Sequence, residues 1–125
     1  MKLAFTPLAI LAAVVLNGCG HESAPAVVRS SVRIEVAKRG DLQLSTGWLR
    51  DAIYVEKPAL CACAPNTEGT LFVLDADGRS AMQVKTLFGQ SAGNFLEVQR
   101  GIKPGDRVIV SDMSAYDSYP KVDLR

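Results

Sequence analysis

Two cysteines separated by a single residue, Cys61 and Cys63, come closest in this chain to a reactive pair. In an oxidising compartment such a pair tends to form a disulfide. Two residues of extended chain place their Cα atoms roughly 6.6 Å apart with parallel side chains, so a bridge requires the backbone to bend. A Cys-x-Cys pair can also bind a soft ion such as Cu(I). The spacing favours free loop thiols, with a strained, reducible disulfide and a metal site as the alternatives.

A second chemically suggestive group consists of Asp75, Asp77, Gly78 and Arg79. The pattern Asp-x-Asp-Gly opens the calcium loop of EF-hands. That loop also needs a third oxygen ligand before its glycine, a bidentate Glu at its end and flanking helices, whereas a strand pattern follows here at residues 81–84. Asp and Gly are typical of tight reversals, so the sequence predicts a hairpin turn without a metal.

The third cysteine, Cys19, closes an export signal. Lys2 supplies a positive charge, residues 3–16 form an almost unbroken apolar run, and residues 16–19 have the form of a lipoprotein cleavage site. The apolar run is short for a bilayer span. We expect a signal peptide at residues 1–18 and acylation of Cys19 as the new first residue. A plain secretory signal is the alternative.

Composition and charge restrict the classes of partner. The 125 residues suffice for one small domain. Loss of residues 1–18 removes one of the 14 basic residues and none of the 13 acidic ones, so the mature chain is formally neutral. Lys and Arg do not cluster. A neutral chain without a basic patch does not attract a phosphate backbone, and we therefore exclude nucleic acid as a partner.

The sequence contains no arrangement typical of an enzyme. His21 is the single histidine, and it lies in the polar segment after Cys19 without a second metal ligand nearby. Paired carboxylates in a repeated context, a glycine-rich phosphate loop and a serine elbow are all missing from the sequence. We therefore expect a non-catalytic protein that uses no metal and no other cofactor.

Alternating apolar and polar residues predict the strands that would position these groups. Residues 32–36 alternate Val, Ile and Val with Arg and Glu, and residues 42–45 alternate again. The charged stretch 38–41 between them reads as a turn, which predicts a hairpin. Further strands are predicted at residues 52–55, 71–74, 82–87, 94–99, 107–111 and 122–124, with loops at 60–69 and 88–93 and the last strand at a sheet edge.

Helical periodicity over three turns is not found anywhere after residue 20, so the predicted fold class is all-β, a small antiparallel β-barrel or roll. A single helical turn is expected within residues 112–117, with Asp112 as its cap. The polar residues 19–28 show no periodicity and suit a flexible tether. Residues 29–125 form the expected β-module.

The clearest local signal is the reversal from Gly101 to Asp106. Pro104 fixes φ near the value required at the second position of a β-turn, and Gly105 accepts the positive φ of the third position of type II. Three successive apolar residues in the segment 107–111 then predict a buried strand that begins directly after the turn. We expect these four turn residues, Gly101, Pro104, Gly105 and Asp106, to shape the module and not to react.

The segment Gly101-Ile-Lys-Pro-Gly-Asp-Arg-Val resembles the G-L-x-x-G-D-x-V signature that closes the periplasmic adaptor proteins, also called membrane fusion proteins, of the haemolysin-D-like family. Residues 36–42 are similar to the opening of that family's first strand. Residues 49–59 and 71–81 look like a later strand and a hairpin, and residues 111–117 are similar to the ending of adaptors that partner ABC-type permeases. The resemblance implies a membrane-proximal module made from both chain ends.

Full-length adaptors also have a lipoyl domain and a long α-helical hairpin that reaches the outer-membrane duct. No heptad pattern occurs in this chain, and the family has no cysteine pair at the loop of Cys61 and Cys63. The resemblance therefore implies a truncated adaptor that contacts an inner-membrane transporter without bridging to the exit duct.

These features predict a lipid-anchored periplasmic subunit that docks on an inner-membrane efflux permease, of the ABC type in preference to the RND type. The turn with Asp75, Asp77, Gly78 and Arg79 is the candidate contact. Gly20 gives no inner-membrane retention signal of the Asp type, but efflux adaptors usually reside at the inner membrane, which we favour. Assembly as a homo-oligomer or beside a full-length adaptor is open. The alternatives are a metal- or ligand-binding lipoprotein that uses Cys61 and Cys63, and a truncated adaptor without function.

Overall fold

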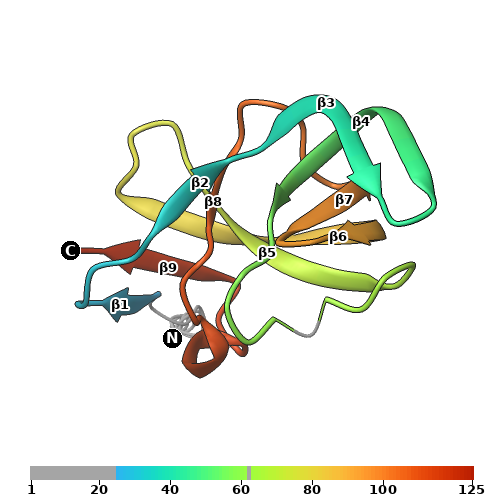
Figure 1. The fold of residues 1–125 in the computed structure, drawn as a ribbon. Helices are drawn as coiled ribbons and strands as arrows, with labels where there is room; N and C mark the ends of the chain where they lie inside the picture. The colour runs from blue at the N-terminus through green and yellow to red at the C-terminus, as the bar shows by residue number, and fades with distance from the viewer. Residues whose placement is uncertain (1–24, 62) are drawn as a thin grey trace, which may run out of the picture.

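The computed structural model describes residues 25–61 and 63–125. Within these residues the chain forms nine strands and one short 3-10 helix, so the predicted all-β fold class is confirmed (Figure 1). The strands are β1 (Ala26–Val28), β2 (Ile34–Val36), β3 (Lys38–Leu44), β4 (Gly47–Glu56), β5 (Glu68–Leu74), β6 (Ser80–Ala92), β7 (Phe95–Arg100), β8 (Arg107–Ile109) and β9 (Lys121–Leu124); the 3-10 helix is η2 (Ser114–Tyr116). The predicted signal peptide, Cys19 and His21 lie outside the described residues. Among the described residues, no helix is long and apolar enough to cross a bilayer.

The sheet curls because its two ends belong to one continuous stretch of chain. Hydrogen-bonded strands follow the order β2-β8-β5-β6-β7-β4-β3, and the single residue Ala37 connects β2 to β3. Ala37 is 1% exposed, and its N–H donates to the carbonyl of Asp106 at 2.8 Å. Its carbonyl accepts from the N–H of Gly105, also at 2.8 Å. The result is an antiparallel half-barrel whose seam is held by the turn before β8.

That turn has the conformation that the sequence predicts. The N–H of Asp106 donates to the carbonyl of Lys103 at 3.1 Å, and Gly105 has a φ of 95°, as the third position of a type II turn requires. The Asp106 carboxylate accepts from the N–H of Lys103 at 3.0 Å and from its Nζ at 2.9 Å. The side chain therefore closes the same turn a second time.

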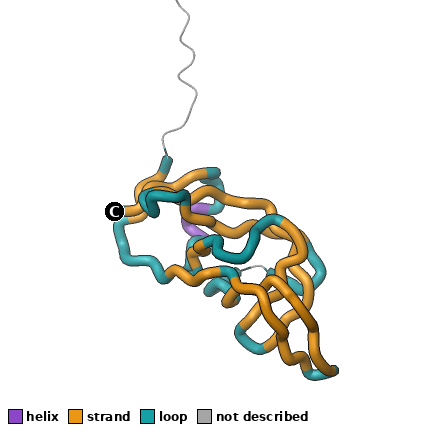
Figure 2. The backbone as a smooth tube through the Cα atoms, turned by 90° about the horizontal axis from the view of Figure 1, so that it is seen from above, coloured by secondary structure: helices purple, strands orange, loops and turns teal. Residues whose placement is uncertain are grey.

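The middle of β5 and the end of β8 are buried on both faces. Val108 and Val110 pack with Leu71 inside the half-barrel, whereas Ile109 and Phe72 face a second apolar cluster under β1, β9 and η2. Val108, Ile109 and Val110 are 0%, 2% and 1% exposed, so the predicted buried strand is confirmed. Viewed from above, strands make up most of the described backbone, and η2 is its one helical segment (Figure 2).

Both chain ends contribute to this second layer. β1 pairs with β9 in parallel, with Ala26 opposite Val122, and β9 also pairs with β6. The last strand is therefore an internal strand, and its predicted edge position is wrong. Val28 is 2% exposed, so the fold already includes residues 26–28, which the sequence assigned to the flexible tether. Their short apolar run is buried because β9 supplies the backbone partners.

The hairpin predicted around residues 38–41 is wrong. These residues belong to β3, which pairs along β4, and the reversal follows at residues 45–46. A register shift between Gly40 and Leu42 accommodates the irregular pattern as a β-bulge. The carboxylate of Asp41 accepts from the N–H of Asp51 at 2.8 Å, so the charged residues stabilise a strand pair and not a turn.

Two further predictions are wrong: the burial of one face of the strand at residues 32–36, and the loop at residues 88–93. Ile34 and Val36 are 38% and 44% exposed because β2 ends the sheet and has only β8 as a partner strand among the described residues. The loop predicted at residues 88–93 is mostly strand, since β6 continues to Ala92 with register shifts around Phe88. Glycine and serine in this stretch mimic a loop, whereas Phe88 is fully buried. In β7, Leu96 and Val98 are buried as predicted.

Substitution of Gly101 tests the close approach of the segment after β7 to the backbone of β6. Gly101 has a φ of 115°, and an added Cβ would overlap with the carbonyl oxygen of Lys85. Gly105 has a similar φ of 95° but nothing within 4 Å of an added Cβ, so it is a matched control. We expect Gly105→Ala to cost about 1–2 kcal/mol in unfolding free energy from strain alone. Gly101→Ala should cost about 2 kcal/mol more, because backbone must move. Urea unfolding measures both, and equal midpoints for the two variants would contradict the packing described.

Candidate functional site

Cys61 and Cys63 form a disulfide in the structure, with their Cα atoms 5.1 Å apart. This is shorter than the separation in an extended chain because the backbone bends: the N–H of Cys61 donates to the carbonyl of Pro58 at 3.3 Å, and Leu60 has a φ of 55°. The structure therefore has a bridge where the spacing favoured free thiols. The sequence could not show the bend, since Leu60 is a residue type that seldom adopts positive φ.

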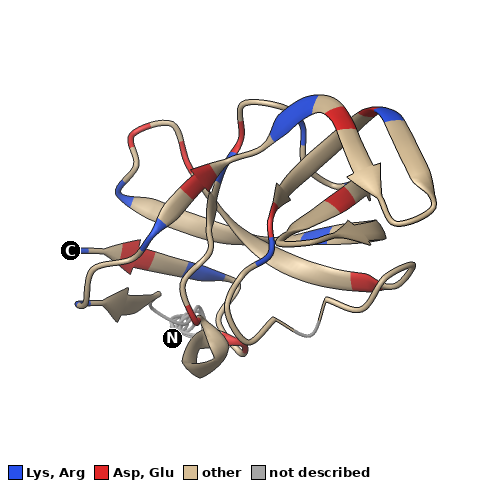
Figure 3. Cartoon of the chain, viewed as in Figure 1, with Lys and Arg blue, Asp and Glu red and all other residues tan. Residues whose placement is uncertain are grey.

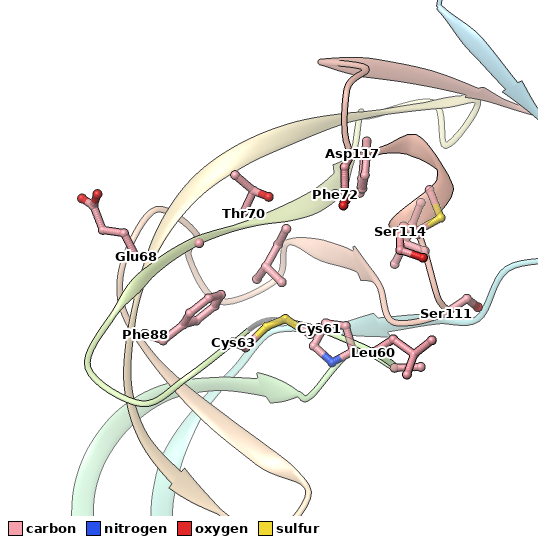
Figure 4. A pocket seen from close by; sticks show the side chains of 16 residues that line it. Leu60, Cys61, Cys63, Glu68, Thr70, Phe72, Phe88, Ser111, Ser114 and Asp117 are labelled. Carbon is pink, nitrogen blue, oxygen red and sulfur yellow. A yellow bond between two sulfur atoms is a disulfide. The ribbon is translucent and has the colours of Figure 1, made fainter.

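The bridge contributes to the wall of a pocket of about 330 Å³ (Figure 4). The other walls are residues 68–72 of β5 and the segment that runs from Ile109 to Asp117 through η2. Cys63 is 6% exposed and packs in the half-barrel core with Phe88, which also lines the pocket. The volume is at the lower end of the range of about 300–1,000 Å³ typical of small-molecule sites.

Buried apolar side chains and exposed polar side chains both line the pocket. The side chains of Leu71, Phe72, Phe88, Ile109 and Met113 come from both apolar clusters of the fold. Glu68 and Asp117 add carboxylates, and Thr70, Ser111 and Ser114 add hydroxyl groups, whereas no Lys or Arg of the described residues lines it. Leu60 is 80% exposed beside the bridge. Such a surface has the dimensions and the mixed lining of a small-molecule site.

The second candidate site, the turn with Asp75, Asp77, Gly78 and Arg79, forms the predicted hairpin between β5 and β6. The hairpin is fixed from two sides. Nη2 of Arg107 donates to the carbonyl of Asp75 at 2.9 Å, and the N–H of Leu124 donates to the carbonyl of Arg79 at 2.8 Å. Because Arg107 directly follows the Gly101–Asp106 turn, the structure brings these two sequence-predicted groups together.

Hydrogen bonds keep the Asp75 carboxylate ionised. The hydroxyl of Ser80 donates to it, and this contact, with smaller contributions from Asp77 and backbone N–H groups, lowers the pKa of Asp75 to about 2. Gly78 has a φ of 75°, and the N–H of Arg79 donates to the Asp77 carboxylate at 2.9 Å. The acidic pair is therefore explained by turn chemistry, as the sequence predicts. No group of metal-ligating side chains is found within residues 25–61 and 63–125.

The two candidate sites share no residue. The pocket is lined by β5 from Glu68 to Phe72, and the hairpin follows Leu74 at the end of this strand (Figure 1). Acidic and basic residues alternate around the hairpin and the adjacent strands, without a cluster of one sign (Figure 3).

Comparisons of this chain with protein-family models, with curated proteins and with solved structures found no match.

Sequence reasoning missed the residues that assemble each site. Arg107 was assigned to a strand, and no local pattern indicates that it reaches the hairpin. Met113 and Asp117 approach β5 only because η2 folds back on it. The helical turn predicted within residues 112–117 is present, but its N-cap is Met113 and not Asp112 as predicted. The carboxylate of Asp112 still accepts from the N–H of Ser114, the first residue of η2, at 2.9 Å, which lowers the pKa of Asp112.

The state of the cysteines can be measured directly. Protein isolated from an oxidising compartment without reductant should not react with iodoacetamide at Cys61 or Cys63 under denaturing conditions, because both sulfur atoms are bonded. After reduction, mass spectrometry should find two alkyl groups on the peptide. The variant Cys61→Ser is the control and should show one reactive thiol throughout. Alkylation of both wild-type cysteines before reduction would contradict the bridge.

The hydrogen bond from Ser80 can be tested through the titration of Asp75. A folded-state pKa of about 2 lies below the ordinary value of 3.8, so the carboxylate stabilises the fold above about pH 4, and this contribution is lost as the pH falls through 2. In Ser80→Ala the pKa should rise toward 3.8, and stability should fall less between pH 4 and pH 2. Carbon-13 NMR of the Asp75 carboxyl measures the pKa. Ser45→Ala, in the β3–β4 reversal, is the control, and an Asp75 pKa that Ser80→Ala leaves at about 2 would refute the assigned cause.

Proposed function

We propose that this protein is a lipid-anchored, non-catalytic subunit of adaptor type that docks on the periplasmic face of an inner-membrane efflux permease. The observation that supports this most directly is the fixed hairpin between β5 and β6. Its residues Ala76, Asp77 and Arg79 are exposed, while its backbone is held by Arg107 and Leu124. A surface that is already ordered loses little conformational entropy on docking. The hairpin is therefore the proposed permease contact.

The arrangement of the chain ends gives independent support. The resemblance to adaptors implies a membrane-proximal module made from both ends of the chain. Here β1 pairs with β9 and β2 pairs with β8, so the first and last described strands are neighbours. In the proposal, acylated Cys19 anchors the module near the membrane, the Gly101–Asp106 turn supports the hairpin, and the permease is of the ABC type. The subunit acts as a homo-oligomer or beside a full-length adaptor.

The pocket favours a second candidate function, a periplasmic ligand-binding lipoprotein. This candidate uses the loop of Cys61 and Cys63 as a pocket wall. Metal binding at the same loop would first require reduction, because the thiolate is the form that coordinates a metal. Binding of an organic ligand has no such requirement. The pocket therefore supports the binding of an organic ligand more than the binding of a metal.

Site-specific photocrosslinking in intact cells tests the docking proposal. A benzoylphenylalanine residue at position 76, in the hairpin, should crosslink the protein to an integral inner-membrane permease, which mass spectrometry would identify. The same residue at position 46, in the exposed reversal between β3 and β4, is the control, because this reversal lies on the far side of the half-barrel (Figure 1). We expect at least about fivefold more permease from position 76, the ratio that corresponds to roughly 1 kcal/mol of contact energy.

The crosslinking result has two other informative outcomes. Equal capture of a permease from both positions would show association without the proposed contact, and would overturn the role of the hairpin. Labelled protein that is lipidated and folded but never crosslinked to a permease would overturn the adaptor function itself. Crosslinks between two copies of this chain would accompany a permease crosslink if the subunit works as a homo-oligomer.

A further inference from the structure

The pocket beside the disulfide reaches the two apolar clusters of the fold at once. Leu71 and Phe88 belong to the half-barrel core, and Phe72, Ile109 and Met113 belong to the cluster under β1 and β9. All five line a cavity of about 330 Å³, and each is at most 8% exposed, so they form its apolar floor. A ligand that removes this surface from water must have a compact apolar body.

The charges of the lining have a single sign. Glu68 and Asp117 are exposed residues with carboxylates at the pocket, and neither takes part in an ion pair with another described residue. Lys and Arg are missing from the described lining, so an anionic ligand would meet only repulsion. A cation would gain Coulomb attraction, and its lost hydration could be replaced in part by the hydroxyl group of Ser114, since the hydroxyl oxygen of Ser111 already accepts from the N–H of Arg33 at 2.6 Å.

The labelled side chains show where the charged head of such a ligand would lie. Ser114 and Asp117 lie at η2, where the N–H of Asp117 donates to the carbonyl of Ser114 at 3.4 Å, and Phe72 packs in the cluster of Met113, next to them in the chain. In Figure 4, Phe88 lies beside the disulfide at the other side of the pocket. Carboxylate, hydroxyl and aromatic ring together are a combination that attracts an organic cation, since an aromatic face also attracts positive charge. The apolar body would then lie toward the disulfide and Phe88.

We propose that this pocket binds an amphipathic organic cation, such as an ammonium group attached to a one- or two-ring apolar body. This ligand class goes beyond the adaptor proposal and rests only on the pocket, and none of the pocket's lining residues belongs to the docking hairpin. Failure of the permease crosslink therefore leaves it intact, and its own failure leaves the docking proposal intact.

Photoaffinity labelling of the full processed protein, with its anchor in zwitterionic phospholipid vesicles, tests the proposal. The probe is 4-benzoylbenzyl-trimethylammonium, and the anion 4-benzoylbenzoate is the control with the same apolar body. We expect saturable labelling by the cation within residues 68–72 and 109–117. The anion should label these peptides at least about fivefold less, the ratio expected when an attractive charge contact of roughly 1 kcal/mol is absent.

Matched variants remove one negative charge each. Asp117→Asn should lower saturable labelling by about fivefold, and Glu68→Gln should lower it less, because Figure 4 shows Glu68 away from the cluster at η2. Asp123→Asn, on β9 and outside the pocket, changes the net charge equally and should have no effect. Circular dichroism verifies that each variant is folded. Since Glu68 and Asp117 are exposed, loss of the fold is not expected.

Three results would overturn the proposal. The first is equal labelling by the cation and the anion, which would show apolar binding without charge selection. The second is labelling that neither Asp117→Asn nor Glu68→Gln reduces. The third is saturable labelling that maps outside the pocket peptides. Cation-selective labelling within the pocket that depends on Asp117 would establish the site and its ligand class.

Discussion

The fold depends on the two backbone hydrogen bonds between Ala37 and the turn at Gly105 and Asp106. One stretch of chain supplies the two ends of the sheet, and a sheet of this kind curls only if the residue between them is held in place. Ala37 has a small side chain that fits the core at 1% exposure. The turn therefore does more than reverse the chain. It joins the seam of the half-barrel to β8, and from there Arg107 reaches the hairpin between β5 and β6.

The parts of the structure that follow from local chemistry could be predicted from the sequence. Pro104 and Gly105 favour a type II turn through their own φ preferences. The three β-branched apolar residues after Arg107 favour a strand that is covered on both faces. Asp75 and Gly78 likewise define a hairpin without reference to the rest of the chain. The all-β class follows from similar local signals, because each strand is predicted from its own alternating or apolar pattern and no segment after residue 20 has the periodicity of a long helix.

The parts that depend on distant residues could not be predicted. The charged residues around Gly40 are also compatible with a turn, but pairing with β4 stabilises them as a bulged strand. In β6, pairing with β7 continues to Ala92, and the ring of Phe88 is fully buried in the core. The pocket is of the same kind. Its walls come from β5, from the bend before Cys63 and from the segment around Met113, which approach one another only in the folded chain.

The disulfide connects this geometry to the compartment of the protein. A bridge between residues two apart closes a very short loop, so in the chain-entropy description it stabilises the fold by only about 1.5 kcal/mol, less than half of what a loop of a hundred residues would contribute. Its larger effect is local, because it fixes the bend at Cys61 against the buried side of Cys63 and thereby the shape of one pocket wall. Reduction would leave most of the fold's stability in place but would free this wall. The predicted export signal would deliver the chain to an oxidising compartment, where the disulfide can form. These conditions matter more for the shape of the pocket than for the stability of the fold.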